Sequence, residues 1–425
     1  MLGSCGLSMR HRPPARGSGR IGAGLLALVW LCFGLDADGG SLLSRGRDAK
    51  PRDSLRCGES RPDGLHGGGA VFYNGQPYIG LQEAIDVIAL AERWVDLKLI
   101  PPAELLRFVG DRKPHGSGYS GNSEHWIHIC PGRWQTNAKI PSGDFTIFIE
   151  AFSDQSERVT LVGGGERILD IGNAMVGFRG IDFEGGGDRA DQEGGGAIRI
   201  QGGYGAMLMV TDCIFRDNHT VGHGGAIYSR AWSSEAGVVA RSSEFVGNHS
   251  DDQGGAVAAF SDFMSVVHLE QSAFRGNSAT TGGGAVVSES TGFGRIDGRG
   301  SRFEGNVATD GPGGAVWVKS VVTDRAYPSV DLRSPSFRGN AAPSGVGGAL
   351  AVENGGPIRL WSAEPIGNQA KEGGAISLNQ KAALHCRACV WGQGDQGNRP
   401  DEVSYVGRSW SALGGEADCD EGYCQ

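Results

Sequence analysis

One short pattern recurs about every 30 residues along this chain, and it constrains the fold more than any other feature. A full copy has a Phe, two further residues, an Asn, a polar stretch, and then Gly-Gly-Ala followed by Ile, Val or Leu; before the last Gly-Gly-Ala, Pro365 takes the place of the Phe. A period of this length indicates an array whose units bury their apolar side chains against their neighbours. The Gly-Gly-Ala copies begin at Gly195, Gly224, Gly254, Gly283, Gly313, Gly347 and Gly373.

The units of this array are not helical. Gly makes up 73 of the 425 residues, and no unit contains an apolar pattern of helical period. A coil of short strands and turns fits instead, with successive coils stacked in parallel about 4.8 Å apart. Such stacking places equivalent residues of successive coils directly on top of one another.

Two ladders of identical side chains are therefore expected. Phe side chains should fill the interior of the coil, and each buried ring is worth roughly 1.5–3 kcal/mol. Asn side chains should bond the backbone of their own turn and of the next coil. The expected ladder residues are Phe215, Phe245, Phe274, Phe303, Phe337, Asn218, Asn248, Asn277, Asn306 and Asn340.

The N-terminal region has the pattern of a secretory signal. Basic residues precede an apolar run, Ile21–Leu35, that is short for a membrane span. A membrane anchor is the alternative. With a signal peptide, we expect the protein to be secreted, extracellular or at the cell surface, with no transmembrane segment in the mature chain.

The sequence divides into five parts. We predict a signal peptide (1–37), a linker (38–66), an N-terminal cap with the first coils and a helical insertion (67–177), the repeat coils (178–380) and a Cys-rich C-terminal cap (381–425). Apolar residues recur at helical spacing over 81–95, which predicts an amphipathic helix covering the first coil.

Four cysteines lie close together near the C-terminus. In an oxidising compartment they favour disulfides, with three possible connectivities. A zinc site built from the same residues is the alternative. These disulfide candidates are Cys386, Cys389, Cys419 and Cys424.

The repeat resembles a known family. Phe-x-x-Asn together with Gly-Gly-Ala-Ile, -Val or -Leu is similar to the polymorphic outer membrane protein repeat of chlamydiae, which also occurs in secreted proteins. That resemblance implies an all-β fold, a right-handed parallel β-helix of the pectin-lyase-like group. The segments "PYIGLQEAID" and "WIHICPGRW" also resemble the helix and first strand that open such coils.

No catalytic or metal motif accompanies the repeat, and we expect no cofactor. Gly222-His223-Gly224 and the pair Asp251-Asp252 lie in the variable turn before Gly-Gly-Ala. A paired-carboxylate mechanism needs two acids at a fixed separation, which a variable turn supplies poorly. These residues are interpreted as solvated turn residues, with a catalytic role as the alternative.

Alternation along the strand after Gly-Gly-Ala predicts an exposed strip. Every second residue should point outward, which places aromatic and charged side chains on one outer face. The strip either supports the sheet as a charge ladder or binds a glycan or protein. Its residues are Tyr228, Arg230, Phe260, Glu289, Trp317, Lys319 and Glu353.

The sequence thus favours a non-enzymatic, adhesin-like binding scaffold over a polysaccharide lyase or hydrolase. The expected partner is an extracellular glycan or a surface protein. A formal net charge of −9 argues against nucleic acid as a partner, because nucleic-acid-binding surfaces are basic.

Overall fold

The computed structural model describes the coil region of the chain. The described residues are 71–73, 76–78, 80–96, 123–143, 145–152, 157–188, 193–203, 205–320, 329–354, 356–378, 382–393, 396–400, 403–405 and 417–420. Every described residue belongs to one compact unit, Arg56–Gln425. The predicted signal peptide and linker lie outside the described residues.

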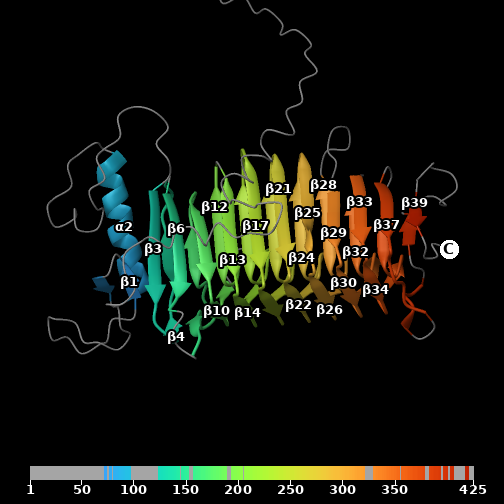
Figure 1. Ribbon diagram of the computed structural model, residues 1–425, viewed down its shortest axis with the longest axis horizontal. Coiled ribbons are helices and arrows are strands. Elements are labelled where there is room, and N and C mark those ends of the chain that lie inside the picture. Colours follow the sequence, from blue (N-terminus) through green and yellow to red (C-terminus); the bar gives the residue numbers. More distant parts are fainter. Residues whose placement is uncertain are drawn as a thin grey trace, which may run out of the picture. The chain divides into compact units, whose positions relative to one another are not determined.

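Four parallel sheets run along the coil, and Figure 1 shows their strands stacked side by side. Sheet A consists of β2 (Gln76–Tyr78), β1 (Val71–Tyr73), β3 (Ser123–Ile129), β6 (Phe145–Ala151), β9 (Met175–Arg179), β13 (Ala206–Thr211), β17 (Glu235–Arg241), β21 (Met264–Glu270), β25 (Phe293–Arg299), β29 (Ser329–Arg333), β33 (Gly356–Trp361), β37 (Ala382–Arg387) and β39 (Ala417–Asp420). Among the described strands of this sheet, the pairs β1–β2 and β1–β3 are antiparallel and the other pairs are parallel.

The other three sheets complete each coil. Sheet B consists of β4 (Gly132–Gln135), β7 (Val159–Val162), β10 (Ile181–Glu184), β14 (Ile214–Arg216), β18 (Glu244–Val246), β22 (Ala273–Arg275), β26 (Arg302–Glu304), β30 (Ser336–Arg338) and β34 (Glu364–Ile366). Sheet D consists of β11 (Gly187–Asp188), β15 (His219–Thr220), β19 (His249–Ser250), β23 (Ser278–Ala279), β27 (Val307–Ala308), β31 (Ala341–Val346) and β35 (Gln369–Glu372). Sheet C consists of β5 (Ala138–Ile140), β8 (Leu169–Ile171), β12 (Ile198–Gly202), β16 (Ile227–Ala231), β20 (Val257–Ser261), β24 (Val286–Ser290), β28 (Val316–Ser320), β32 (Leu350–Glu353), β36 (Ile376–Leu378) and β38 (Val403–Tyr405).

Each repeat forms one coil, which passes through sheets A, B, D and C in that order. Phe245 pairs with Phe274 in sheet B, and Val257 pairs with Val286 in sheet C, so equivalent residues lie in register. The predicted all-β parallel β-helix is confirmed.

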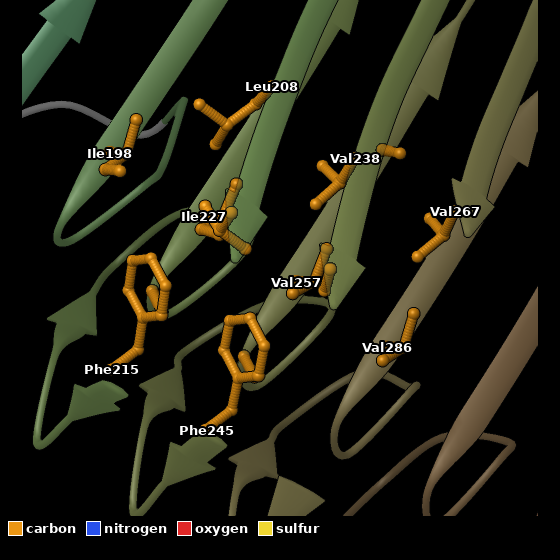
Figure 2. Packing of buried hydrophobic residues seen from close by; sticks show 14 of the residues in the cluster. Ile198, Leu208, Phe215, Ile227, Val238, Phe245, Val257, Val267 and Val286 are labelled. Carbon is orange, nitrogen blue, oxygen red and sulfur yellow. The ribbon is translucent and has the colours of Figure 1, made fainter. Parts of the chain in front are cut away.

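The interior of the coil is apolar, and Figure 2 shows its side chains converging from sheets A, B and C. Phe rings stack along sheet B with centroids 4.6–5.0 Å apart and nearly parallel planes. The predicted Phe ladder is confirmed, and Phe183 extends it by one coil.

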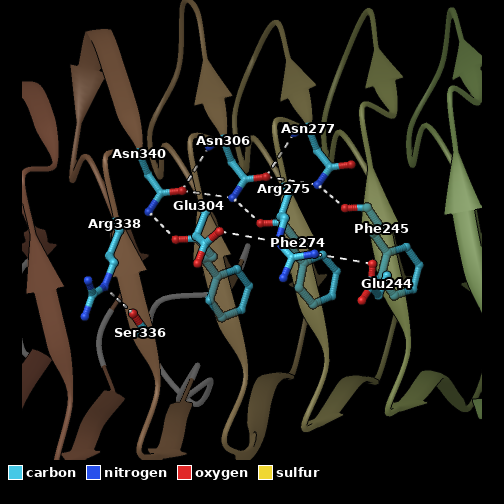
Figure 3. A network of polar contacts seen from close by, with 11 residues as sticks. Glu244, Phe245, Phe274, Arg275, Asn277, Glu304, Asn306, Ser336, Arg338 and Asn340 are labelled. Atoms are coloured by element: carbon cyan, nitrogen blue, oxygen red, sulfur yellow. Dashed lines mark hydrogen bonds and ion pairs between the residues drawn. The ribbon is translucent and has the colours of Figure 1, made fainter. Parts of the chain in front are cut away.

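The Asn ladder satisfies the side-chain amides completely. Asn277 Nδ2 donates to Phe245 O at 3.0 Å and to Asn306 Oδ1 at 2.9 Å, while its backbone N donates to the same Oδ1 (Figure 3). The same bonds repeat along the coil and continue to Asn368 and Asn398. Because each amide is buried with its donors and acceptor paired, the ladder fixes the register of the turns at little desolvation cost.

Glycine in the Gly-Gly-Ala turn has a steric cause. Gly254 has a φ of +69°, where only Gly is unstrained. A Cβ on the next residue, Gly255, would lie 2.1 Å from the carbonyl oxygen of Gly284 in the following coil. The two glycines therefore allow a sharp bend and close stacking of successive coils.

The first coils and the last are closed differently. Helix α2 (Leu81–Asp96) covers the first coils and buries Leu81, Ala84, Ile85 and Ile88, as its periodicity predicts (Figure 1). Cys386 and Cys389 form a disulfide, whereas the side chain of Cys419 and all of Cys424 lie outside the described residues. In the described part of the chain, no helix is long and apolar enough to cross a membrane.

Candidate binding face

The predicted exposed strip is wrong in one respect. Tyr228, Phe260 and Trp317 point away from the coil interior, as alternation requires, but each is only 5% exposed. Together with Ala258, Val287 and Ala351 they form a second apolar cluster on the outer face of sheet C. The aromatic members of the strip are therefore packing residues.

The turns between sheets D and C cover this cluster. The His223 ring lies 4.5 Å from the Phe260 ring and 5.7 Å from that of Tyr228. A Cβ on Gly282 would lie 2.5 Å from Trp317 Cε3, so the turn that contains Gly282 lies directly against the indole. His223 is thus mostly buried rather than a solvated turn residue. Burial lowers the pKa of its imidazole, although the negative charges of Asp252 and Glu289 act to raise it.

The charged members of the strip form pairs at its margin. Arg230 Nη2 lies 2.7 Å from Asp262 Oδ1. Lys319 Nζ lies 3.4 Å from Glu289 Oε2 and 5.1 Å from the centre of the Trp317 ring. These contacts fit the predicted charge ladder that supports the sheet.

A cavity of about 250 Å³ opens where the aromatic column ends. Ala351 and Ser377 follow Trp317 in register, so small side chains leave space beneath the turn at Gly311–Pro312. Glu353 lines this cavity. Burial raises the pKa of its carboxyl, although the positive charge of Lys319 acts to lower it.

Three exposed aromatic residues lie instead at the junction of sheets C and A, two of them in the turns and Phe293 at the start of β25. Trp232, Phe263 and Phe293 are 47%, 46% and 43% exposed and belong to three successive coils. The backbone N–H of Phe293 donates to Phe263 O at 3.0 Å, which holds two of these turns in stack. We call these three residues the aromatic edge.

Beside the aromatic edge, the outer face of sheet A is charged. The column His268–Asp297–Asp331–Arg359 runs in register over β21, β25, β29 and β33. From β21 to β37, outward arginines outnumber outward carboxylates. The carboxylates are Glu270, Asp297 and Asp331, and the arginines are Arg295, Arg299, Arg333, Arg359 and Arg387. We call the aromatic edge and this outer face together the binding face.

Asp297, one of the carboxylates of the binding face, lies between a histidine and an arginine. Asp297 Oδ1 lies 2.5 Å from His268 Nδ1, and Oδ2 lies 2.6 Å from Arg295 Nε. Burial raises the pKa of the Asp297 carboxyl, but the two partners lower it by a larger amount. The pKa therefore lies below its ordinary value. Glu270 binds Arg299 at 2.6 Å. Within the described residues Arg333 is exposed and has no ion-pair partner, so an anion can approach its guanidinium.

The binding face was not predicted from the sequence, because the predicted strip is built from the residues that follow Gly-Gly-Ala. The signal was present in the less regular part of each repeat, where "SDFMSVVHLE", "TGFGRIDGR" and "SVDLR" place charged residues at alternate positions. Cys213 is a free, buried thiol, and burial raises its pKa to about 12.

One comparison identifies the repeat. Residues 212–230 match the Chlamydia polymorphic membrane protein (Chlamydia_PMP) repeat, and this segment contains Phe215-x-x-Asn218 and Gly224-Gly225-Ala226. The chain is a parallel β-helix with a polymorphic membrane protein repeat. No curated protein and no solved structure gives a significant match to it.

The matched segment of this β-helix runs from β14 through β15 into β16. It thus covers the sheet B, D and C part of one coil and stops before the aromatic edge. The residues that recur in the repeat are the buried Phe, Asn and Gly, so the match to the polymorphic membrane protein repeat describes the scaffold and not the binding face.

Proposed function

We propose that this protein is a non-enzymatic, adhesin-like scaffold of the cell surface or the extracellular space that binds an acidic glycan along the binding face. The observation that carries the proposal is the pairing of exposed aromatic rings with an excess of arginines on one face of the coil. Aromatic rings stack on sugar rings, and guanidinium groups bind carboxylate or sulfate in a planar fork.

The regular rise of the coil supports a long ligand. Outward positions recur on every coil at the strand spacing of about 4.8 Å, and Arg299 and Arg333 are direct neighbours in register, so an extended polymer can contact several outward arginines. An acidic polymer is favoured because the face is locally cationic although the chain as a whole has a formal net charge of −9. Several weak contacts on one polymer add up through effective concentration.

The test is a binding assay on immobilised acidic and neutral glycans with matched variants. Arg333→Ala with Arg359→Ala should weaken binding by about tenfold for each charged hydrogen bond lost. Arg302→Ala is the control, since Arg302 is also exposed but lies in sheet B. Equal binding of all variants, or a preference for neutral glycans, contradicts the proposal.

A second function is favoured by one observation. Asp297 and Asp331 are direct neighbours in register on the outer face of sheet A, as two acids of a polysaccharide hydrolase or lyase would be. Against a role as general acid, the pKa of Asp297 is lowered rather than raised. Incubation with the same glycans, followed by measurement of reducing ends and unsaturated products, distinguishes the two functions. Turnover that is lost in Asp331→Asn would show that the protein is an enzyme and would contradict the binding proposal.

A further inference from the structure

Two histidines lie one coil apart on the outside of sheet D. His219 and His249 follow Asn218 and Asn248 directly, and they pair in register in β15 and β19. Their rings are 5.1 Å apart at an interplanar angle of 24°. The coil period thus brings together two imidazoles that are 30 residues apart in the sequence.

A carboxylate joins the two imidazoles. Asp251 Oδ1 lies 3.2 Å from His219 Nε2 and 2.9 Å from His249 Nε2. One donor atom from each of the three residues lies within 4.8 Å of the others. Four ligands at about 2.0–2.1 Å around a tetrahedral zinc ion are separated by roughly 3.3 Å, so small side-chain rotations suffice to bring these donors to one ion.

Ser278 orients one of the rings. Its Oγ lies 2.8 Å from His249 Nδ1, in the next coil along sheet D. When Nδ1 carries the proton and donates it to Ser278, the Nε2 lone pair is free for a metal ion. Outer partners of this kind are typical of histidines that bind metals.

We propose that His219, His249 and Asp251 bind a divalent transition-metal ion, for which Zn²⁺ is the probe. Two imidazoles and one carboxylate are a borderline donor set that suits zinc, copper or nickel. Calcium and magnesium are disfavoured because they prefer six or more oxygen ligands. All three residues are partly exposed, which leaves a coordination position for water or for a group from a partner.

The site belongs to one pair of coils. In register with His219 and His249, the array has Gly187 on one side and Ser278 on the other. A metal ion here would join two successive coils and should raise the melting temperature, since a ligand that binds only the folded state stabilises it. Replacing these histidines by Ser introduces a residue that already occurs at the same position of the next coil, Ser278.

The test is zinc titration of the chelator-treated full chain by isothermal calorimetry, with melting followed by circular dichroism. We expect one zinc ion per chain and a rise in melting temperature. Loss of a residue that only orients a metal ligand typically lowers metal affinity by about 10- to 100-fold. The double variant His219→Ser with His249→Ser removes two ligands, so it should lower zinc affinity by at least about 100-fold. His385→Ser, on β37 of sheet A, is the matched control and should bind zinc normally.

Two results would overturn the site. One is a wild-type chain that takes up no zinc at millimolar concentration. The other is zinc binding that is equal in wild type and the double variant, which would place the ion elsewhere. If the double variant does not fold, Asp251→Asn replaces it, since this change keeps the side-chain shape and removes the ligand charge. Glycan binding does not enter these readouts, so the metal site and the binding face can fail separately.

Discussion

The outer faces of sheets C and A arise from the same alternation along strands of the same coils, yet they differ in kind. On sheet C the outward residues Tyr228, Phe260 and Trp317 are covered and apolar. On sheet A the outward residues of β25 and β29 are mostly charged, and Arg299 and Arg333 are exposed. Alternation therefore decides which way a side chain points, while the neighbouring turns decide whether water reaches it.

The turns on the two sides of sheet C explain the difference. Between sheets D and C, the turn carries the variable polar stretch and lies back over the strand, with His223 against Phe260. Between sheets C and A, the link has only two residues, Asp262 and Phe263, in one coil, too few to cover either face. The longer turn thus makes the outer face of sheet C a second core, whereas the two-residue link beside β21 leaves the outer face of that strand uncovered.

The largest expected effect is on stability at Trp317. Trp317→Ala removes a buried indole between two turns and should cost about 3–5 kcal/mol, as much as Phe274→Ala in the interior ladder. Urea unfolding followed by circular dichroism measures both. Trp232→Ala on the aromatic edge is the control and should change stability by less than about 0.5 kcal/mol. A loss below about 1 kcal/mol at Trp317 would show that the outer face of sheet C is not a core.

A smaller effect is expected from pH at His223. Burial lowers the pKa of this imidazole in the folded chain, in spite of the charges of Asp252 and Glu289, and Arg230 lowers it further. In the unfolded chain a histidine titrates near pH 6.5, so below that pH the unfolded state takes up the proton first. Stability should therefore decrease as pH falls below about 6.5, and it is fully present above it.

The variant His223→Gln sharpens this test because Gln253 occupies the same position in the next coil. Urea midpoints measured between pH 5 and 7.5 should fall less steeply in the variant than in the wild type. Parallel slopes for the two proteins would mean that His223 titrates as a solvent-exposed residue and that the turn does not cover the cluster.

The repeat predicted the scaffold well because the same residue is required in every coil. Phe274 and Asn277 recur since each must fit the one below it, and their stacking and hydrogen bonds follow the prediction. Asn398 was missed because its turn, "DQGNRP", lacks the preceding Phe.

The candidate sites were predicted poorly because they depend on residues that differ between coils. Phe260 points outward as expected, but its burial depends on His223 in a turn of the preceding coil, a contact that alternation cannot reveal. His219 and His249 are 30 residues apart, and only knowledge that this separation is one coil makes them neighbours.

The smallest stability effect, and the sharpest contrast between the faces, is expected at Phe293. This ring is 43% exposed at the start of β25, and Phe293→Ala should change the free energy of unfolding by less than about 0.5 kcal/mol. Its loss should nevertheless weaken glycan binding by about tenfold if the ring stacks on a sugar, because partly desolvated stacking contacts are worth about 1 kcal/mol or more. Val287→Ala, in the covered cluster of sheet C, should show the reverse: lower stability with unchanged binding. If Phe293→Ala leaves binding intact while Arg333→Ala weakens it, the arginines alone form the binding surface and the aromatic edge serves another purpose.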